Sequence, residues 1–312
     1  MKLTFLFFIL IVIISGCATP FGEKELSGPD VFRCPYREGR GVIADFVQYA
    51  PPDQVREGEL FTLGLVFFNM FDEQKNIDLQ IQDTTDTPGF PPEGIHENVN
   101  IESAVVENER WIEPGCRIDQ EEFVEFETED YAYQSVKFDK DTVQFRGTLT
   151  YDTAVDLGFM MCVFNPAQGG NFQCSTEQQY GGNELGLMNT KAPVFLDRVQ
   201  RTLVGSRKET KVKLTFDVRN GGNGYVGGDG GVDVVLRSSD LAFRCFSDEA
   251  ASQGTQQLHL ILDRDEQVAH VQCETSLTAD RLETHYVDFM LQHTYVFPFS
   301  SQPMELLQSR EG

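Results

Sequence analysis

Carboxylate side chains gather in two segments of the sequence that also favour turns. Asp72, Glu73 and Asp78 follow a strand-like run in the first half, and Asp229 lies in a glycine-rich segment of the second half. Calcium prefers dense oxygen ligands of this kind, although the spacing is not that of an EF-hand. Glycines also serve any tight hairpin, since they admit positive φ angles. The four residues are therefore candidate calcium ligands, and a plain solvated loop is the alternative interpretation.

Motifs of the common catalytic sites are absent from the sequence. There is no Gly-x-Ser-x-Gly, no His-Glu-x-x-His, no Walker loop and no Gly-x-Gly-x-x-Gly, and the five histidines are not spaced as helical ligand pairs. Two acidic residues in a cleft would still suit hydrolysis of a glycan. We therefore expect a protein without chemistry of its own and with no cofactor besides possible calcium. An extracytoplasmic, glycan-directed hydrolase that uses paired carboxylates is the alternative.

A proline-rich segment carries the remaining candidates for a binding function. Four prolines interrupt the strand pattern between residues 84 and 116, which favours a long irregular insertion. Phe90, Pro91, Pro92 and Trp111, the only tryptophan, lie within it. These side chains would offer a rigid apolar contact to a partner. The alternative is that they close the insertion over the open end of the domain.

The N-terminal segment that ends at Cys17 predicts export and lipid attachment. A basic start precedes an apolar run, Leu3 to Ile14, that is too short to span the ~30 Å hydrocarbon core and suits a signal peptide. The sequence Ile-Ser-Gly-Cys that ends at Cys17 resembles the lipobox of bacterial lipoproteins. The resemblance implies cleavage before Cys17 and a diacylglycerol on its thiol, which would hold the protein on the extracytoplasmic side of a membrane, at the cell surface or in the periplasm. An ordinary cleaved signal peptide is the alternative.

Six cysteines remain for an oxidising compartment, enough for three disulfides. They contain no CxxC and no Cys/His spacing suited to zinc, so disulfides are favoured over a metal site. Fifteen connectivities are formally possible. Cys162 and Cys174 flank a turn-rich segment that would bring two strands together, and Cys245 and Cys273 are the only cysteines of the C-terminal half. Elimination leaves Cys34 with Cys116.

The elements that must position these residues are predicted to be strands. Alternation with period two dominates, and long stretches with a 3.6-residue period are absent outside the signal peptide, which predicts an all-β fold with very little helix. The runs 61–69 and 212–220 correspond residue for residue, and both end on an asparagine. A later strand at 149–153 echoes the strand at 291–295, with a slightly smaller offset between the two copies. Two landmarks in the same order predict an internal duplication.

Short alternating strands with turns between them are typical of a two-sheet β-sandwich. The segment from Pro51 to Asn69 resembles the opening of bacterial and archaeal immunoglobulin-like surface domains. The segment from Arg219 to Gly224 resembles the Asn-x-Gly turn of the CARDB-type group among them. The resemblance implies two tandem immunoglobulin-like β-sandwich domains. Such domains are commonly spacers, adhesins or binding modules.

The amino-acid composition and net charge limit the kinds of molecule that the protein can bind. Hydrophobic residues make up 40% and charged residues 24% of the 312 residues, which are ordinary globular values. The 49 acidic against 25 basic residues give a net charge of −24, which would repel nucleic acid. We therefore expect a lipid-anchored binding, adhesion or envelope-assembly module, with an envelope protein or a glycan as partner. Its expected parts are a signal peptide (1–16), a tether (17–40), a first sandwich (41–175) with the insertion 84–116, a linker (176–191) and a second sandwich (192–308).

Overall fold

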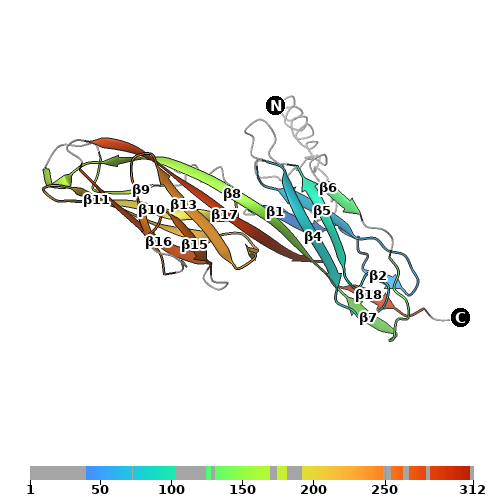
Figure 1. The fold of residues 1–312 in the computed structure, drawn as a ribbon. Helices are drawn as coiled ribbons and strands as arrows, with labels where there is room; N and C mark the ends of the chain where they lie inside the picture. Colours follow the sequence, from blue (N-terminus) through green and yellow to red (C-terminus); the bar gives the residue numbers. More distant parts are fainter. Residues whose placement is uncertain are drawn as a thin grey trace, which may run out of the picture. The chain divides into compact units, whose positions relative to one another are not determined.

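The computed structural model of the chain is nearly all β, as the alternation predicted (Figure 1). It describes residues 40–71, 73–102, 124–127, 131–168, 174–180, 192–248, 250, 254–262, 267–278 and 282–309. These residues all belong to one compact unit, Tyr36–Gly312. Their only helical element is the short 3-10 turn η4 (Pro166–Gln168). Within these ranges, no helix has the length and apolar character needed to cross a membrane.

The strands of the first half and the beginning of the second are, in chain order, β1 (Val42–Phe46), β2 (Gln54–Arg56), β3 (Gly64–Asn69), β4 (Lys75–Asp83), β5 (Ile95–Ile101), β6 (Val124–Glu127), β7 (Lys140–Val143), β8 (Phe145–Val163), β9 (Glu177–Tyr180) and β10 (Val194–Gly205). The others are β11 (Thr210–Asn220), β12 (Tyr225–Val226), β13 (Gly231–Ser238), β14 (Arg244–Phe246), β15 (Gln257–Ile261), β16 (Val268–Leu277), β17 (Glu283–Ser300) and β18 (Met304–Leu307).

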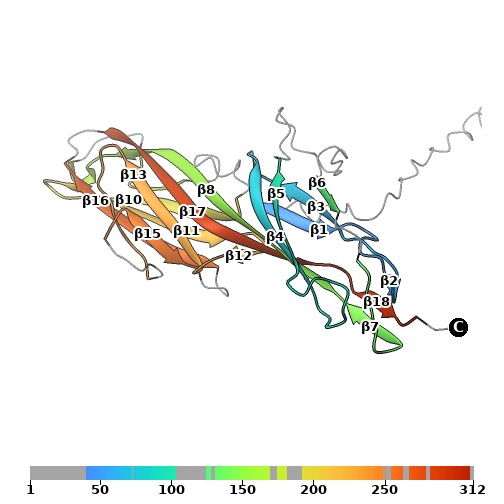
Figure 2. The same cartoon turned by 45° about the vertical axis from the view of Figure 1, so that its right-hand side comes forward.

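The largest sheet is built around β8 and β17, the two longest strands. Its order is β15-β13-β17-β8-β4-β5, and β12 also pairs with β17. Figures 1 and 2 show β8 and β17 side by side, and they pair antiparallel along the whole of β17, from Glu283 opposite Val163 to Ser300 opposite Arg146. The other sheets have the orders β14-β16-β11-β10-β9, β1-β3-β6 and β2-β18-β7. Strands from both predicted halves therefore share one sheet.

The core forms where sheets pack face to face. Along β8 every second side chain is buried, beginning at Phe145. In the second half, the ring of Phe216 on β11 packs edge-on against Phe289 on β17, with 4.9 Å between the centroids. In the first half, Phe46 on β1 lies 5.4 Å from Phe299 at the far end of β17. Burial of each such ring contributes about 1.5 to 3 kcal/mol to folding. The packing is that of a β-sandwich.

The two asparagines that suggested a duplication have the same structural role. Asn69 ends β3 opposite Val42 of β1, and Asn220 ends β11 opposite Val194 of β10. The Nδ2 of each donates to the carbonyl oxygen four residues ahead, at 2.7 and 2.9 Å. The Oδ1 of each accepts from the backbone N–H two residues ahead, at 3.0 Å in both. Each side chain thus shapes the turn that follows its strand, which supports the duplication.

In the large sheet, too, the two halves of the chain contribute corresponding strands. The first half supplies β5, β4 and β8 from one edge, and the second supplies β15, β13 and β17 from the other. Asp152 on β8 pairs with Thr294 on β17, and the offset between these positions equals the offset of the later sequence echo, between Leu149 and Leu291. The register therefore places a pseudo-twofold axis through the pair Asp152–Thr294.

Two expectations about irregular segments were wrong. Within the predicted insertion 84–116, Ile95–Ile101 forms β5 and pairs with β4 in regular antiparallel register. β5 is an edge strand whose ends, Ile95 and Ile101, are buried while four of the residues between them are polar, so it lacks strong alternation. Similarly, Glu177–Tyr180 at the start of the predicted linker forms β9, which pairs with β10 and buries only Tyr180. Residues 103–116 and 181–191 lie outside the described part of the chain.

Candidate functional site

A groove of about 560 Å³ crosses the centre of the β8–β17 ladder. It lies at the pseudo-twofold axis, and both halves of the chain contribute to it. The residues that line it come from the start of β4 and the turn before it, from the middle of β8 and β17, from the turn between β12 and β13, from β13 and from β15: Glu73, Lys75, Asp152, Thr153, Ala154, Gly227, Gly228, Asp229, Gly231, Asp233, His259, Gln292, His293 and Thr294.

One wall of the groove is an imidazole held between two carboxylates. The Nδ1 of His259 lies 2.8 Å from the Oδ1 of Asp233, its cross-strand neighbour on β13. The Nε2 of the same ring lies 2.9 Å from the Oδ2 of Asp229 in the preceding turn. Because both ring nitrogens face carboxylate oxygens, this arrangement favours the doubly protonated, charged imidazole.

The glycine-rich turn makes this arrangement possible. Gly231 lies between the two aspartates, and a Cβ at this position would overlap the Cε1 and Nε2 atoms of His259. Gly228 has a φ of +62°, a backbone conformation that glycine adopts without strain. The Oδ1 of Asp229 accepts from the backbone N–H of Gly231 at 3.0 Å and closes the turn. The glycines therefore bring the Asp229 carboxylate to the ring.

The charges of this wall stabilise each other. The backbone N–H of Gly231 and the His259 ring lower the pKa of Asp229 below its usual range. The hydrogen bond to Asp233 raises the pKa of His259, and the contact with Asp229 adds to this shift. The aspartate therefore stays ionised, and the histidine holds its proton to a higher pH than a free imidazole does.

The floor of the groove contains polar groups without hydrogen-bond partners. His293 on β17 and Thr153 on β8 are opposite each other in the ladder, and only 7% and 4% of their surfaces are exposed. Both ring nitrogens of His293 and the Oγ1 of Thr153 lack a hydrogen bond. Burial lowers the pKa of His293 to about 4, so its imidazole is neutral at physiological pH. Its ring meets Tyr295 edge-on, at 6.2 Å between the centroids.

The remaining lining residues leave the groove acidic. The Nζ of Lys75 lies 2.5 Å from the Oε1 of Glu73 and also sits over the Phe71 ring. The Oγ1 of Thr294 donates to the Oδ1 of Asp152 at 2.6 Å. Four carboxylates, those of Glu73, Asp152, Asp229 and Asp233, thus share the groove with one ammonium and one imidazole that can be charged. The surplus of negative charge would attract a cation.

The three expected calcium ligands that the structure describes do not assemble into one centre. Glu73 and Asp229 line the same groove, but each already has a cationic partner. Asp78 lies on β4, accepts from the amide of Gln80 and is not among the lining residues. Asp72 lies outside the described residues. No group of three or more His, Cys, Asp or Glu side chains in the described ranges is placed to hold a metal ion.

The residues expected to form an apolar contact for a partner lie in different environments. Phe90 is only 8% exposed, and its ring packs against Tyr131 and Phe145 at 5.0 and 5.3 Å between centroids. Phe90 therefore agrees with the alternative interpretation, because its ring covers the end of the core and is not presented on a contact surface. Pro91 is half-buried and Pro92 is exposed in the turn before β5, and Trp111 lies outside the described residues.

Two of the three predicted disulfides are present. Cys162 is bonded to Cys174, and Cys245 to Cys273. Cys34 and Cys116, the pair left by elimination, and Cys17, the predicted lipid site, lie outside the part that the structure describes.

No sequence motif indicates the two histidines of the groove or two of its four carboxylates. Asp152, Asp233, His259 and His293 are far apart in the chain, and only the β8–β17, β17–β13 and β13–β15 pairings bring them together. One signal was available, since the offset of the later echo aligns His293 with Tyr151. The imidazole of His293 thus occupies a buried strand position at which the first half has the phenol ring of Tyr151.

Comparison with known proteins gives no family. No family model matches the chain, and no curated protein matches it either. Among solved structures, red sea bream transglutaminase is similar over 86% of this chain and 31% of its own, with 6% identity and a TM-score of 0.21. A BuGH86 variant in complex with neoagarooctaose is similar over 85% of this chain and 34% of its own, with 7% identity and a TM-score of 0.15. The chain spans about a third of each, and neither likeness supports an argument about function.

Proposed function

We propose that the chain is an exported, lipid-anchored binding protein without chemistry of its own, and that the groove at the pseudo-twofold axis binds a positively charged ammonium group. The proposal covers the roles of adhesion and envelope assembly, because each needs a recognition surface. The observation that carries it is the combination, in one groove, of surplus carboxylates with buried polar groups that lack partners.

An ammonium group fits this combination better than a metal ion does. Its N–H groups can each donate to a single oxygen, so it does not need three or more converging ligands, which the described residues do not provide. The unprotonated nitrogen of neutral His293 and the hydroxyl of Thr153 can accept a further hydrogen bond after a small adjustment at the floor. A buried polar group without a partner costs about 1 to 3 kcal/mol, which a ligand would recover in part.

Two kinds of envelope molecule present such a group. The lysine side chains of a protein partner carry primary ammonium groups, and so do deacetylated amino sugars of a glycan. Both sources share the chemistry that the groove would recognise.

Export and anchoring rest on the signal peptide and on the lipobox-like sequence that ends at Cys17. The pairing of Cys162 with Cys174 and of Cys245 with Cys273 supports this proposal, since disulfides persist in oxidising compartments. The net charge of −24 agrees with a surface that repels anionic headgroups, so that attachment would depend on the acyl chains.

The binding test is calorimetric titration of the disulfide-bonded protein with hexalysine and, separately, with a glucosamine oligomer. We expect at least one to bind, more weakly as salt is raised. Asp152→Asn should weaken binding by about tenfold, the effect of losing one charge-assisted contact. Asp156→Asn is the matched control, since it removes an exposed carboxylate on the same face of β8 outside the groove. Equal effects of the two variants, or no binding of either ligand, would reject the proposal.

The anchor has its own test. Metabolic labelling with a palmitate analogue should mark the wild-type protein and not Cys17→Ser. Equal labelling of both would reject the lipoprotein assignment while leaving the binding result unaffected.

The alternative of a glycan hydrolase meets a difficulty in the groove. Such an enzyme needs one carboxyl that remains protonated to act as the acid. The shift of Asp229 is in the opposite direction, because its pKa is lowered. Burial raises the pKa of Asp83, but its hydroxyl partner is Tyr133 at 2.7 Å and it does not line the groove. Binding without hydrolysis therefore remains our proposal.

A further inference from the structure

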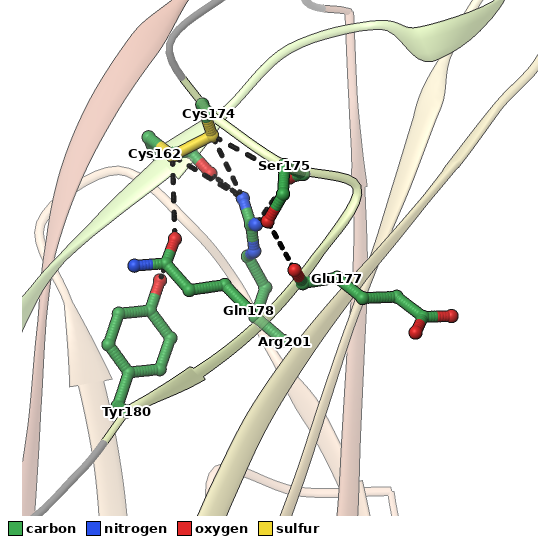
Figure 3. The surroundings of a disulfide bond; sticks show 7 residues. All are labelled: Cys162, Cys174, Ser175, Glu177, Gln178, Tyr180 and Arg201. Carbon is green, nitrogen blue, oxygen red and sulfur yellow. Dashed lines mark hydrogen bonds between the residues drawn. A yellow bond between two sulfur atoms is a disulfide. The ribbon is translucent and has the colours of Figure 1, made fainter.

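A buried guanidinium group contacts one of the two disulfides (Figure 3). Arg201 on β10 is fully buried, with 0% of its surface exposed. Its Nη1 donates to the carbonyl oxygen of Cys162 and lies 3.5 Å from the Sγ of Cys162 and 3.2 Å from the Sγ of Cys174. Its Nη2 donates to the carbonyl oxygen of Ser175 at 2.6 Å. The guanidinium group therefore faces both sulfur atoms.

Among the described residues, no carboxylate pairs with the positive charge of Arg201. No ion pair joins it to a carboxylate in the described ranges, and its Nε has no hydrogen-bond partner. Burial lowers the pKa of Arg201, which is the sign of a charge poorly compensated by its surroundings. A buried charge of this kind is costly, and carbonyl dipoles and neutral sulfur offset only part of the cost.

Reduction of the disulfide would supply the missing anion. A thiolate beside an arginine is stabilised, and its pKa falls below the usual value of about 8.5. In the folded protein both sulfur atoms already lie within hydrogen-bonding reach of Nη1, so a thiolate on either cysteine would need no movement of the strands. Arg201 therefore favours the reduced state and also makes either cysteine a better leaving group in thiol exchange.

The second disulfide provides a comparison within the same molecule. Cys245 and Cys273 face each other on β14 and β16, and only 1% and 0% of their surfaces are exposed. In the described part of the chain, no arginine or lysine donates to either of these sulfur atoms. Cys174, in contrast, is partly exposed at the start of the segment that leads into β9.

We infer that the Cys162–Cys174 disulfide is a site of thiol exchange with a dithiol reductant, activated by Arg201, and that Cys245–Cys273 is a structural bond. A thiolate of the dithiol attacks the Sγ of Cys174, and the disulfide breaks with its electron pair on Cys162. The second thiol of the reductant then attacks the mixed disulfide and releases Cys174. The two protein sulfurs gain two electrons and the dithiol is oxidised to its disulfide.

The test is equilibration of the folded protein with mixtures of reduced and oxidised dithiothreitol, followed by alkylation and mass mapping of each cysteine. We expect Cys162–Cys174 to open at a ratio of reduced to oxidised reagent at least tenfold lower than Cys245–Cys273 does. We also expect the released thiols to be alkylated at a pH below that of a free cysteine. The reverse order of opening, or simultaneous opening, in the wild-type protein would overturn the inference without any variant.

Two variants distinguish activation of the Cys162–Cys174 disulfide by Arg201 from the effect of its solvent exposure. Arg201→Gln should move the opening of Cys162–Cys174 towards that of the other disulfide and return the alkylation pH to the ordinary value. Arg244→Gln is the matched control, because Arg244 is an exposed cation next to Cys245. If Arg201→Gln does not fold, Arg201→Lys retains a cation and should keep a lowered alkylation pH. An unchanged opening ratio in a folded Arg201→Gln would contradict the role of the guanidinium group.

Discussion

Thr294 donates a hydrogen bond from its Oγ1 to the Oδ1 of Asp152 across the β8–β17 ladder, at 2.6 Å. The same two residues are register partners, and the offset between them is the one at which the later strands of the two halves correspond. The bond therefore lies on the pseudo-twofold axis and at the groove that both halves line.

Loss of the bond on the axis should destabilise the fold slightly. We expect Thr294→Val to lower the free energy of unfolding by about 1 kcal/mol, the usual net contribution of a hydrogen bond, measured by urea denaturation. Thr284→Val, at an exposed position of the same strand, is the matched control. Equal losses in the two variants would show that the bond to Asp152 contributes nothing.

The wall formed by Asp229, His259 and Asp233 should give a pH-dependent stability. The raised pKa of His259 adds stability that is complete below about pH 6.5 and is lost as pH rises through the folded-state pKa. The lowered pKa of Asp229 adds stability above about pH 4 that is lost as pH falls. We therefore expect His259→Asn to be most destabilising between about pH 4 and 6.5.

The measurement is a series of urea unfolding curves for the wild type and His259→Asn between about pH 4 and 9. The difference between the two proteins should shrink towards the alkaline end of this range. A difference that does not change with pH would contradict the charged imidazole.

His293 should have the opposite pH dependence. Its folded-state pKa of about 4 lies below that of a free histidine, so the unfolded chain binds the proton more readily between about pH 6.5 and 4. Acidification across this range should therefore cost stability on the order of 3 kcal/mol. His293→Phe keeps an aromatic ring at the floor and should remove this part of the acid sensitivity. Unchanged acid sensitivity in a folded His293→Phe would show that folding does not lower the pKa of this histidine.

The space at Gly231 should be required only because of His259. We expect Gly231→Ala to destabilise the wild-type protein by about 1 to 3 kcal/mol, since a Cβ would overlap the imidazole ring. In the His259→Ala background the ring is absent, and the same substitution should cost much less. A double-mutant cycle on thermal unfolding measures this coupling. Additive effects would mean that the cost of Gly231→Ala does not arise from overlap with the His259 ring.

Local patterns in the sequence predicted the parts of the fold that local physics determines. Period-two alternation along 145–163 is the direct result of burial on one face of β8, so the all-β class followed from it. The cysteines of Cys162–Cys174 have a sequence separation of only 12, across a turn, and their pairing was therefore predictable. The turns after Asn69 and Asn220 were visible as a repeat because each uses an asparagine for the same two hydrogen bonds.

The groove depends on pairings that no local pattern contains. His293 meets Thr153, which lies in the other half of the sequence, only because β8 and β17 pair along the whole of β17. The edge strand β5 was missed because four of its seven residues are polar and three prolines precede it at 88, 91 and 92. Phe90 was a candidate for a contact surface for the same reason, since proline density suggested an exposed loop, and its burial agrees with the alternative that the chain covers the core there.

The most direct test of the account is an NMR titration that follows the imidazole signals of the five histidines while hexalysine or a glucosamine oligomer is added. If the groove binds an ammonium group, the His259 and His293 ring signals should shift saturably with one of these ligands, and His96 and His270 should not. Saturable shifts at His96 or His270 alone, or no shift at His259 and His293, would contradict the assignment of the groove as the binding site.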